Sequence, residues 1–185
     1  MSVVEKNLPV KMSRPHLDNV PAFALPKEFS VRWHQPGDEQ HWLDIHLAAD
    51  KFNPITPDLF AREFGQTSDG LKDRQCFLLD ADQKPVATAT AWFNDNFNCT
   101  ACGRVHWVAV VPAHQGRGLG KALLTIVCRR LRALGHPRAY LTTSTARIPA
   151  IKLYRGFGFV PLIRTADDAA MWREVEAELS ALSGR

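Results

Sequence analysis

The chain has 185 residues, of which 45% are hydrophobic and 23% are charged, and a net charge of +4. These values are typical of one soluble globular domain with a full hydrophobic core. No apolar run approaches the ~20 residues of a membrane span, and the N-terminus lacks the basic-then-apolar layout of a secretion signal. These features argue against a membrane or exported protein, so we expect a cytoplasmic one.

The charge is unevenly distributed along the chain. Residues 1–103 carry 10 Lys/Arg and 14 Asp/Glu, residues 104–164 carry 11 Lys/Arg and no acid, and residues 165–185 carry two bases and five acids. A basic centre of this kind indicates a polyanionic partner, such as a phosphorylated cofactor, a nucleic acid or an anionic surface.

The first part of the chain predicts an arm followed by helices and a hairpin. Residues 1–27 contain four prolines and predict an extended arm that lies on the domain or is partly disordered. The domain itself is expected over residues 28–164. Its first half predicts a strand over 28–35, a helix over 39–50, a helix that begins at Pro57 with Thr56 as N-cap, and a hairpin over 75–93.

The second part of the chain predicts alternating strands and helices. In chain order these are a turn region over 94–103, a strand over 104–111, a helix over 120–135, a strand over 138–144, a helix over 148–154 and a last strand over 158–163. Residues 165–185 predict a terminal helix packed on the domain, with one apolar stripe of Met171, Val175 and Leu179. This order predicts an α+β fold with a central sheet of mixed direction.

The four cysteines predict neither a disulfide framework nor a metal site. Cys99 and Cys102 have the two-residue gap of a metal or redox pair, but no second pair supplies the four ligands of a structural zinc site. We expect ordinary reduced thiols and no metal.

The segment 112–124, PAHQGRGLGKALL, places three glycines and two cations at the start of a helix. It is not a Walker A loop or a dinucleotide fingerprint, because the glycine and hydroxyl positions of those motifs are not matched. It fits Q-x-x-G-x-G, which is formed by Gln115, Gly116, Arg117, Gly118, Leu119 and Gly120. Such glycines let backbone N–H groups converge on a pyrophosphate, with Arg117 and Lys121 as additional cations.

With its flanking segments, this loop resembles the GNAT superfamily of Gcn5-related N-acetyltransferases. The resemblance includes Val108, Ala109 and Val110 before the loop, and AIKLYRGFGF at 150–159, which matches A-x-x-L-Y-x-x-x-G-F. It covers roughly residues 29–163 and implies a GNAT fold, with a mixed, mostly antiparallel sheet flanked by helices. It also implies that the pyrophosphate belongs to coenzyme A. Acetyl-CoA would then donate an acetyl group directly to a small-molecule or peptide amine in a ternary complex.

The resemblance also suggests catalytic roles. The backbone of residues 108–110 would line the pantetheine arm and stabilise the oxyanion, and Tyr154 stands at the position of the general acid. His106 is the candidate base, since an imidazole with a pKa near ~6.5 suits proton abstraction. In a regular strand His106, Val108 and Val110 share one face, although a bulge would change that. An equally good interpretation is that His106 is a structural residue whose hydrogen bonds are made within the sheet.

Arg147 departs from the family pattern, which often has Asn at this position. Its side chain could reach a cofactor phosphate or point toward an acidic substrate. By resemblance, the segments 51–60 and 94–102 border the acceptor site.

Two alternatives stay open beside the acyltransferase. A non-catalytic acyl-CoA-binding regulatory domain would keep the fold and the loop. A nucleic-acid-binding module would use the basic centre, but the aromatics of a stacking platform are not interleaved there. We therefore expect no nucleic acid and no membrane as partner, and either a monomer or a homodimer.

Overall fold

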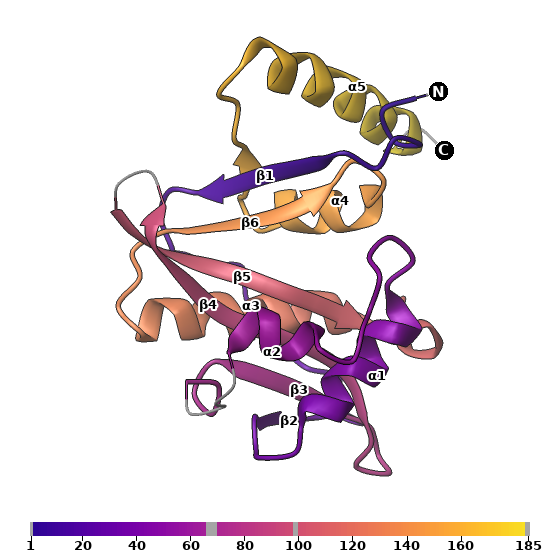
Figure 1. Ribbon diagram of the computed structural model, residues 1–185, viewed down its shortest axis with the longest axis vertical. Helices are drawn as coiled ribbons and strands as arrows, with labels where there is room; N and C mark the ends of the chain where they lie inside the picture. The colour runs from indigo at the N-terminus through magenta and orange to yellow at the C-terminus, as the bar shows by residue number, and fades with distance from the viewer. Residues whose placement is uncertain (1, 66–69, 98–99, 184–185) are drawn as a thin grey trace.

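A single mixed sheet organises the computed structural model, which describes residues 2–65, 70–97 and 100–183 (Figure 1). Within these residues, seven strands follow the order β2-β3-β4-β5-β6-β1-β7. The strands are β1 (Pro9–Arg14), β2 (Ser30–Trp33), β3 (Gln75–Leu79), β4 (Pro85–Phe97), β5 (Thr100–Val110), β6 (Ala139–Ser144) and β7 (Val160–Pro161). All neighbours are antiparallel except β5 and β6, so the predicted α+β fold with a mixed, mostly antiparallel sheet is confirmed.

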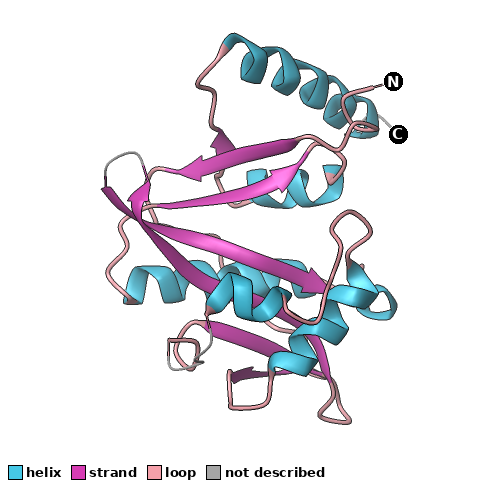
Figure 2. Cartoon of the chain, in the orientation of Figure 1, coloured by secondary structure: helices cyan, strands magenta, loops and turns pink. Residues whose placement is uncertain are grey.

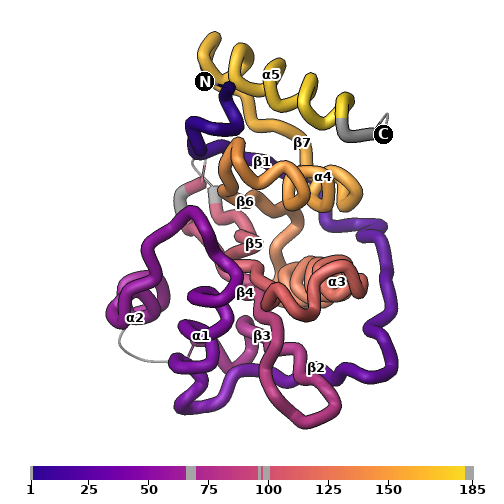
Figure 3. Tube along the Cα trace, turned by 90° about the vertical axis from the view of Figure 1, so that its right-hand side faces the viewer, coloured from indigo at the N-terminus to yellow at the C-terminus, as the bar shows by residue number. Residues whose placement is uncertain are grey.

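Helices cover both faces of the sheet (Figure 2). They are α1 (Glu39–Ala49), α2 (Leu59–Phe64), α3 (Leu119–Ala133), α4 (Ile148–Gly156) and α5 (Ala166–Ser183), with a short 3-10 turn at Pro112–His114. Seen from the side, α1 and α2 lie on one side of the sheet and α3 and α4 on the other (Figure 3). None of the helices among the described residues is both long and apolar enough to cross a membrane.

Strand β3 shows how the two cores form. All five of its residues are buried. Cys76 and Leu78 pack in the core that includes α3, whereas Phe77 and Leu79 pack in the core that includes α1 and α2. Because successive side chains of a strand point to opposite faces, a continuous apolar run can serve a sheet that is covered on both sides.

Several predicted boundaries differ from the structure. The second helix begins at Leu59 with Asp58 as N-cap, rather than at Pro57 with Thr56 as N-cap. Strands β4 and β5 extend into the region 94–103, which was expected to be a turn. The sequence also predicted no strand within the arm 1–27, yet β1 lies inside the sheet between β6 and β7.

The uneven charge along the chain is partly balanced by ion pairs within the fold. Arginines of the basic segment 104–164 contact carboxylates from outside it. These pairs are Arg117–Glu28, Arg130–Asp73, Arg132–Asp18, Arg147–Asp50 and Arg155–Glu176. The basic centre is therefore in part a pairing partner for the acidic flanks, and by itself it does not require a polyanion.

Strands β5 and β6 are paired only at their beginnings. Gly103 lies opposite Ala139 and Arg104 lies opposite Tyr140. Figure 1 shows the two strands diverging beyond these pairs. This divergence positions the site described below.

Candidate active site

Two adjoining hollows lie along the end of β5. The first, of about 380 Å³, is lined by the glycine loop and by α4, and we call it the loop pocket. The second, of about 520 Å³, is lined by residues of the N-terminal segment, α1, α2, β5, β6 and α4, and we call it the polar cleft. The two hollows share a wall formed by Val108, Ala109, Val110, Gln115 and Tyr154.

The glycine loop has the backbone geometry that an anion site requires. Gly116 and Gly118 have φ angles of 77° and 83°, in the left-handed region that favours glycine. Gly118 is also the N-cap of α3. Among the hydrogen bonds between described residues, none uses the backbone N–H groups of residues 116–120. These free donors at a helix N-terminus suit a pyrophosphate.

Two side-chain contacts fix the loop against its surroundings. The Gln115 Nε2 donates a hydrogen bond to the Val110 carbonyl at 2.9 Å, which ties the loop to the end of β5. A Cβ at Gly120 would lie 3.1 Å from the Leu153 side chain, so glycine allows α3 and α4 to pack closely here.

The two cations of the loop are held by contacts rather than left mobile. Arg117 pairs with Glu28 at 2.7 Å, and its guanidinium lies 4.7 Å from the Phe29 ring centre. The Lys121 ammonium lies 5.0 Å from the Phe23 ring centre. Both cations therefore stand against the segment that leads into β2.

Tyr154 stands where the two hollows meet. It comes from α4, and only 9% of its surface is exposed. Burial raises the pKa of Tyr154 to about 12, so its hydroxyl is protonated at neutral pH. A proton donor is thus placed on the shared wall.

The expected common face of His106, Val108 and Val110 is wrong, because β5 contains a bulge. Thr88 of β4 lies opposite Ala109 and Thr90 lies opposite His106, so β5 has one extra residue there. Trp107 has a φ of 48°, which is rare for a large side chain. Val108 and Val110 pack toward the α3 core, whereas the His106 ring packs against Phe64 of α2, 5.6 Å between centres.

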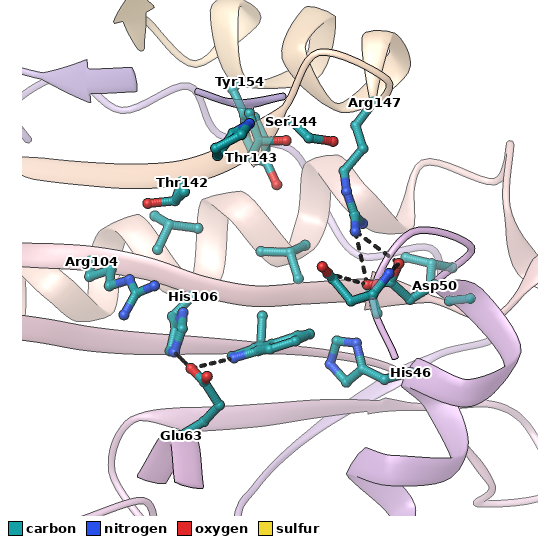
Figure 4. A pocket seen from close by; sticks show the side chains of 18 of the residues that line it. His46, Asp50, Glu63, Arg104, His106, Thr142, Thr143, Ser144, Arg147 and Tyr154 are labelled. Carbon is teal, nitrogen blue, oxygen red and sulfur yellow. Dashed lines mark hydrogen bonds and ion pairs between the residues drawn. The ribbon is translucent and has the colours of Figure 1, made fainter. Parts of the chain in front are cut away.

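A carboxylate from α2 meets His106 at this bulge. The Glu63 Oε2 lies 2.9 Å from the His106 Nε2, and it accepts a hydrogen bond from the Trp107 Nε1 at 2.9 Å (Figure 4). The sequence contained no signal for Glu63, which lies on another element and in no motif.

The expected pKa near ~6.5 for His106 is also corrected. Burial lowers the pKa of His106 to about 4. The neighbouring imidazole, more than any other group, lowers the pKa of Glu63 to about 2. At neutral pH the imidazole is therefore neutral and the carboxylate is ionised.

A second histidine lines the polar cleft and was not predicted. His46 of α1 is only 2% exposed, and its ring lies 4.3 Å from Trp42 and 5.0 Å from Trp107, centre to centre. Its Nε2 has no hydrogen-bond partner among the described residues. Burial lowers the pKa of His46 to about 3, which keeps this imidazole neutral as well.

Arg147 lines the polar cleft but not the loop pocket. One of its terminal nitrogens lies 2.8 and 3.0 Å from the two carboxylate oxygens of Asp50 (Figure 4). The Asp50 side chain is 4% exposed, and it also accepts hydrogen bonds from the N–H groups of Phe52 and Asn53. Arg147 thus pairs with a carboxylate of the chain itself, and its two expected roles, toward a cofactor phosphate or an acidic substrate, stay predictions.

The described cysteines line neither of the two hollows. Among the described residues, no group of three or more His, Cys, Asp or Glu could hold a metal ion. Cys76, Cys102 and Cys128 are buried free thiols outside both linings, and Cys99 lies outside the described residues.

The chain is similar in sequence to bacterial acetyltransferases. It is 33% identical over 146 residues to mycothiol acetyltransferase of Pseudarthrobacter chlorophenolicus, which covers 76% of this chain and 45% of that protein. It is 31% identical over 144 residues to mycothiol acetyltransferase of Streptomyces coelicolor, which covers 77% of this chain and 46% of that protein. The chain thus spans about half the length of these curated relatives.

The fold is shared with solved acetyltransferases. A GCN5-related N-acetyltransferase from Sphaerobacter thermophilus superposes with a TM-score of 0.69 at 23% identity, covering 83% of this chain and 48% of that chain. The ribosomal-protein-S18-alanine N-acetyltransferase of Escherichia coli superposes with a TM-score of 0.60 at 23% identity, covering 75% and 86%. In the NatC complex, bound to Gag peptide and CoA, the matching chain has a TM-score of 0.62 at 18% identity, covering 75% and 88%.

The family match extends over most of the elements described above. Residues 33–159 match the acetyltransferase (GNAT) family, a range that runs from β2 through α4. This range includes the divergent strands, the glycine loop and Tyr154. The chain therefore belongs to the GNAT family of acetyltransferases.

Proposed function

We propose that the chain transfers an acetyl group from acetyl-CoA to an amine, with both substrates bound at once. The observation that carries this proposal is the wall shared by the two hollows. One side of it faces a backbone anion site and the other faces a cleft with titratable groups. Direct transfer requires the acyl donor and the acceptor to meet at one place, and Tyr154 stands there.

The loop pocket suits coenzyme A in the residues that it offers. The free N–H groups of residues 116–120 and the positive end of α3 would hold the pyrophosphate. The end of β5, residues 108–110, would line the pantetheine arm. We assign Arg117 and Lys121 an auxiliary role, since both already contact other side chains.

The polar cleft supplies groups for the proton transfers. As the amine nitrogen forms a bond to the acetyl carbon, His106 accepts the proton that the nitrogen loses. As the carbon–sulfur bond breaks, Tyr154 donates its proton to the departing sulfur, and backbone N–H groups at residues 108–110 stabilise the charge on the carbonyl oxygen. His106 then returns its proton to solvent and Tyr154 regains one, so that the products are the amide and free CoA.

A small-molecule acceptor is favoured over a peptide. The relatives with the higher sequence identity are named for mycothiol, whereas the peptide-acting proteins share the fold at lower identity. Acceptors of the mycothiol type are therefore the first to test.

The proposal is tested by an acceptor screen with the purified chain. Amines of the mycothiol type, other small amines and short peptides are incubated with acetyl-CoA, and mass spectrometry detects an acceptor heavier by one acetyl group. Calorimetry with CoA is run in parallel. CoA binding without acetylation of any acceptor would support the regulatory domain instead, and absence of CoA binding would contradict both.

A further inference from the structure

We propose that Glu63 is a positioning residue for His106. Its carboxylate holds the imidazole in the tautomer that carries a proton on Nε2, which leaves Nδ1 as the proton acceptor. This inference rests on the proposed function for its catalytic consequence, whereas its structural part can be tested without any substrate.

The geometry at Glu63 supports this role. Its Oε2 is approached by two ring nitrogens at 2.9 Å each, Nε2 of His106 and Nε1 of Trp107. An indole nitrogen can only donate a hydrogen bond, so it orients the carboxylate as well as stabilising its charge. Glu63 is thereby fixed from one side by Trp107 and presents the same oxygen to His106.

The tautomer follows from the chemistry of the two partners. An ionised carboxylate can only accept hydrogen bonds, so the His106 nitrogen that faces it has to carry the hydrogen. In a neutral imidazole the other nitrogen then has a free lone pair. His106 lines the polar cleft. Among the described residues its Nε2 meets no acceptor at full hydrogen-bond geometry, and the Glu63 Oε2, 2.9 Å away, is the carboxylate oxygen that it faces.

The bulge in β5 explains how both rings reach one carboxylate. Neighbouring residues of a regular strand point to opposite faces, so His106 and Trp107 could not both face α2. The φ of 48° at Trp107 turns its side chain to the same side as His106. Backbone strain of this kind is retained where surrounding contacts maintain it, and here the Trp107–Glu63 hydrogen bond is one such contact.

Other charged and titratable groups near His106 do not compete for this role. His46 of α1 is neutral and buried, and Arg104 of β5 itself disfavours a charged imidazole. Glu63 of α2 acts in the opposite sense and favours the imidazolium. It is therefore the group that stabilises His106 at the moment when Nδ1 takes up a proton.

The low pKa of His106 indicates when it acts. With a pKa of about 4 it is too weak a base to deprotonate a free ammonium efficiently. An amine nitrogen becomes far more acidic as its bond to the carbonyl carbon forms, and His106 is matched to that later proton. The pH–rate profile should then report the pKa of the acceptor amine. No second titration should appear in it between pH 6 and 7.5.

Nitrogen-15 NMR of the histidine side chains tests the structural part directly. The His106 signal is identified by its loss in His106→Gln. At neutral pH the wild-type chain should show a neutral imidazole with the proton on Nε2. Glu63→Gln should show a mixture of tautomers, because an amide can either donate or accept. A wild-type His106 with its proton on Nδ1, or a protonated one, would overturn the inference whatever the activity.

Kinetics with an acceptor from the screen test the catalytic part. Glu63→Gln should lower kcat by about 10²-fold or more while the KM of acetyl-CoA stays within a few-fold, as expected for a misoriented base. Asp58→Asn, which changes an exposed carboxylate of the same segment, is the matched control and should leave kcat unchanged. An unchanged kcat in Glu63→Gln would overturn the positioning role. Failure of every acceptor would contradict the proposed function, while the tautomer would still decide the structural part.

Discussion

The loop pocket and the polar cleft share one wall but are built in different ways. The lining of the loop pocket comes from two short stretches, 108–120 and 149–154, and the groups that we propose for binding are backbone N–H groups. The polar cleft takes its polar side chains from the N-terminal segment, α1, α2, β5, β6 and α4. A backbone site needs glycines at fixed spacing, which leaves a motif in the sequence. A side-chain site assembled from distant segments leaves none.

The largest expected effect is the loss of coenzyme A binding in Gly118→Val. A Cβ at this position would meet no atom within 4 Å, so the protein could hold it without a clash. The damage comes from the φ of 83°, which a β-branched residue adopts only with strain, and from a side chain that enters the loop pocket. CoA at ~100 times its Kd should stabilise the wild-type chain by roughly 2.7 kcal/mol and the variant not at all.

Gly135→Val is the matched control for this change. Gly135 has a φ of 84° and equally open surroundings, but it lies at the far end of α3. Gly135→Val should lower the melting temperature about as much as Gly118→Val does, as measured by thermal melts. Calorimetry should show that its CoA binding is unchanged. Equal CoA binding in both variants would show that the loop is only a turn.

The next largest effect is expected for Tyr154→Phe, at the wall shared by the two hollows. Removing the hydroxyl should lower kcat by about 10²–10⁴-fold, because a general acid is lost, while the Kd of acetyl-CoA changes only a few-fold. The other tyrosine of the chain, Tyr140, lines neither hollow, so Tyr140→Phe should retain kcat. Full activity of Tyr154→Phe in a chemistry-limited assay would remove it from the mechanism.

How far the sequence predicts the fold depends on whether the signal is local. The hairpin of β3 and β4 was predictable, since two apolar runs flank a polar turn. Strand β1 was missed, although Val10 and Met12 alternate with Lys11 and Ser13. Four prolines outweighed that alternation, and only the pairing with β6 and β7, from the opposite end of the chain, makes β1 part of the sheet.

The same distinction applies to the candidate site. The glycine loop and Tyr154 lie in motifs, so their neighbourhood could be predicted. Glu63 and Asp50 reach the polar cleft through α2 and α1, and no spacing rule connects them with His106 or Arg147. The bulge at Trp107 was unpredictable for a related reason, because bulges form where strands pair and a single strand does not reveal them.

The two buried histidines of the polar cleft should make the protein less stable in acid. His46 and His106 have folded-state pKa values of about 3 and 4, below the unfolded value of 6.5. Their contribution is present above pH ~6.5 and is lost as the pH falls toward the folded values, since the unfolded chain then binds more protons. With ~1.4 kcal/mol per pKa unit, we expect the free energy of unfolding to fall by roughly 3–5 kcal/mol between pH 7 and 4.5.

Urea unfolding at several pH values measures this loss. His46→Gln should reduce it, whereas His41→Gln, which changes an exposed histidine of the same helix, should not. If the loop pocket binds CoA through backbone groups, as proposed, CoA affinity at pH 5 should stay near its neutral value. An equally acid-sensitive CoA affinity would contradict the difference between the two hollows.

A smaller effect is expected for Arg147→Gln, confined to the polar cleft. The change removes the cation that pairs with the buried Asp50 and loosens the segment after α1, which lines the cleft at Asn53. The KM of the acceptor should rise by about tenfold, and the Kd of CoA should stay within about twofold. Arg155→Gln, which breaks an exposed pair on α4, the helix that Arg147 precedes, is the control. A large loss of CoA affinity in Arg147→Gln would instead place Arg147 on a cofactor phosphate.

The smallest effect should come from Arg117→Ala, although Arg117 lies within the motif itself. Its guanidinium is 44% exposed and pairs with a half-exposed Glu28, so its charge is partly neutralised and well screened by salt. If backbone N–H groups bind the pyrophosphate, the Kd of CoA should rise by no more than about threefold, and the difference should shrink further at high salt. Calorimetry of both chains at low and high salt measures this directly. A Kd that rises tenfold or more would mean that a side chain, and not the backbone, binds the anion. That result would contradict the proposed difference between the two hollows.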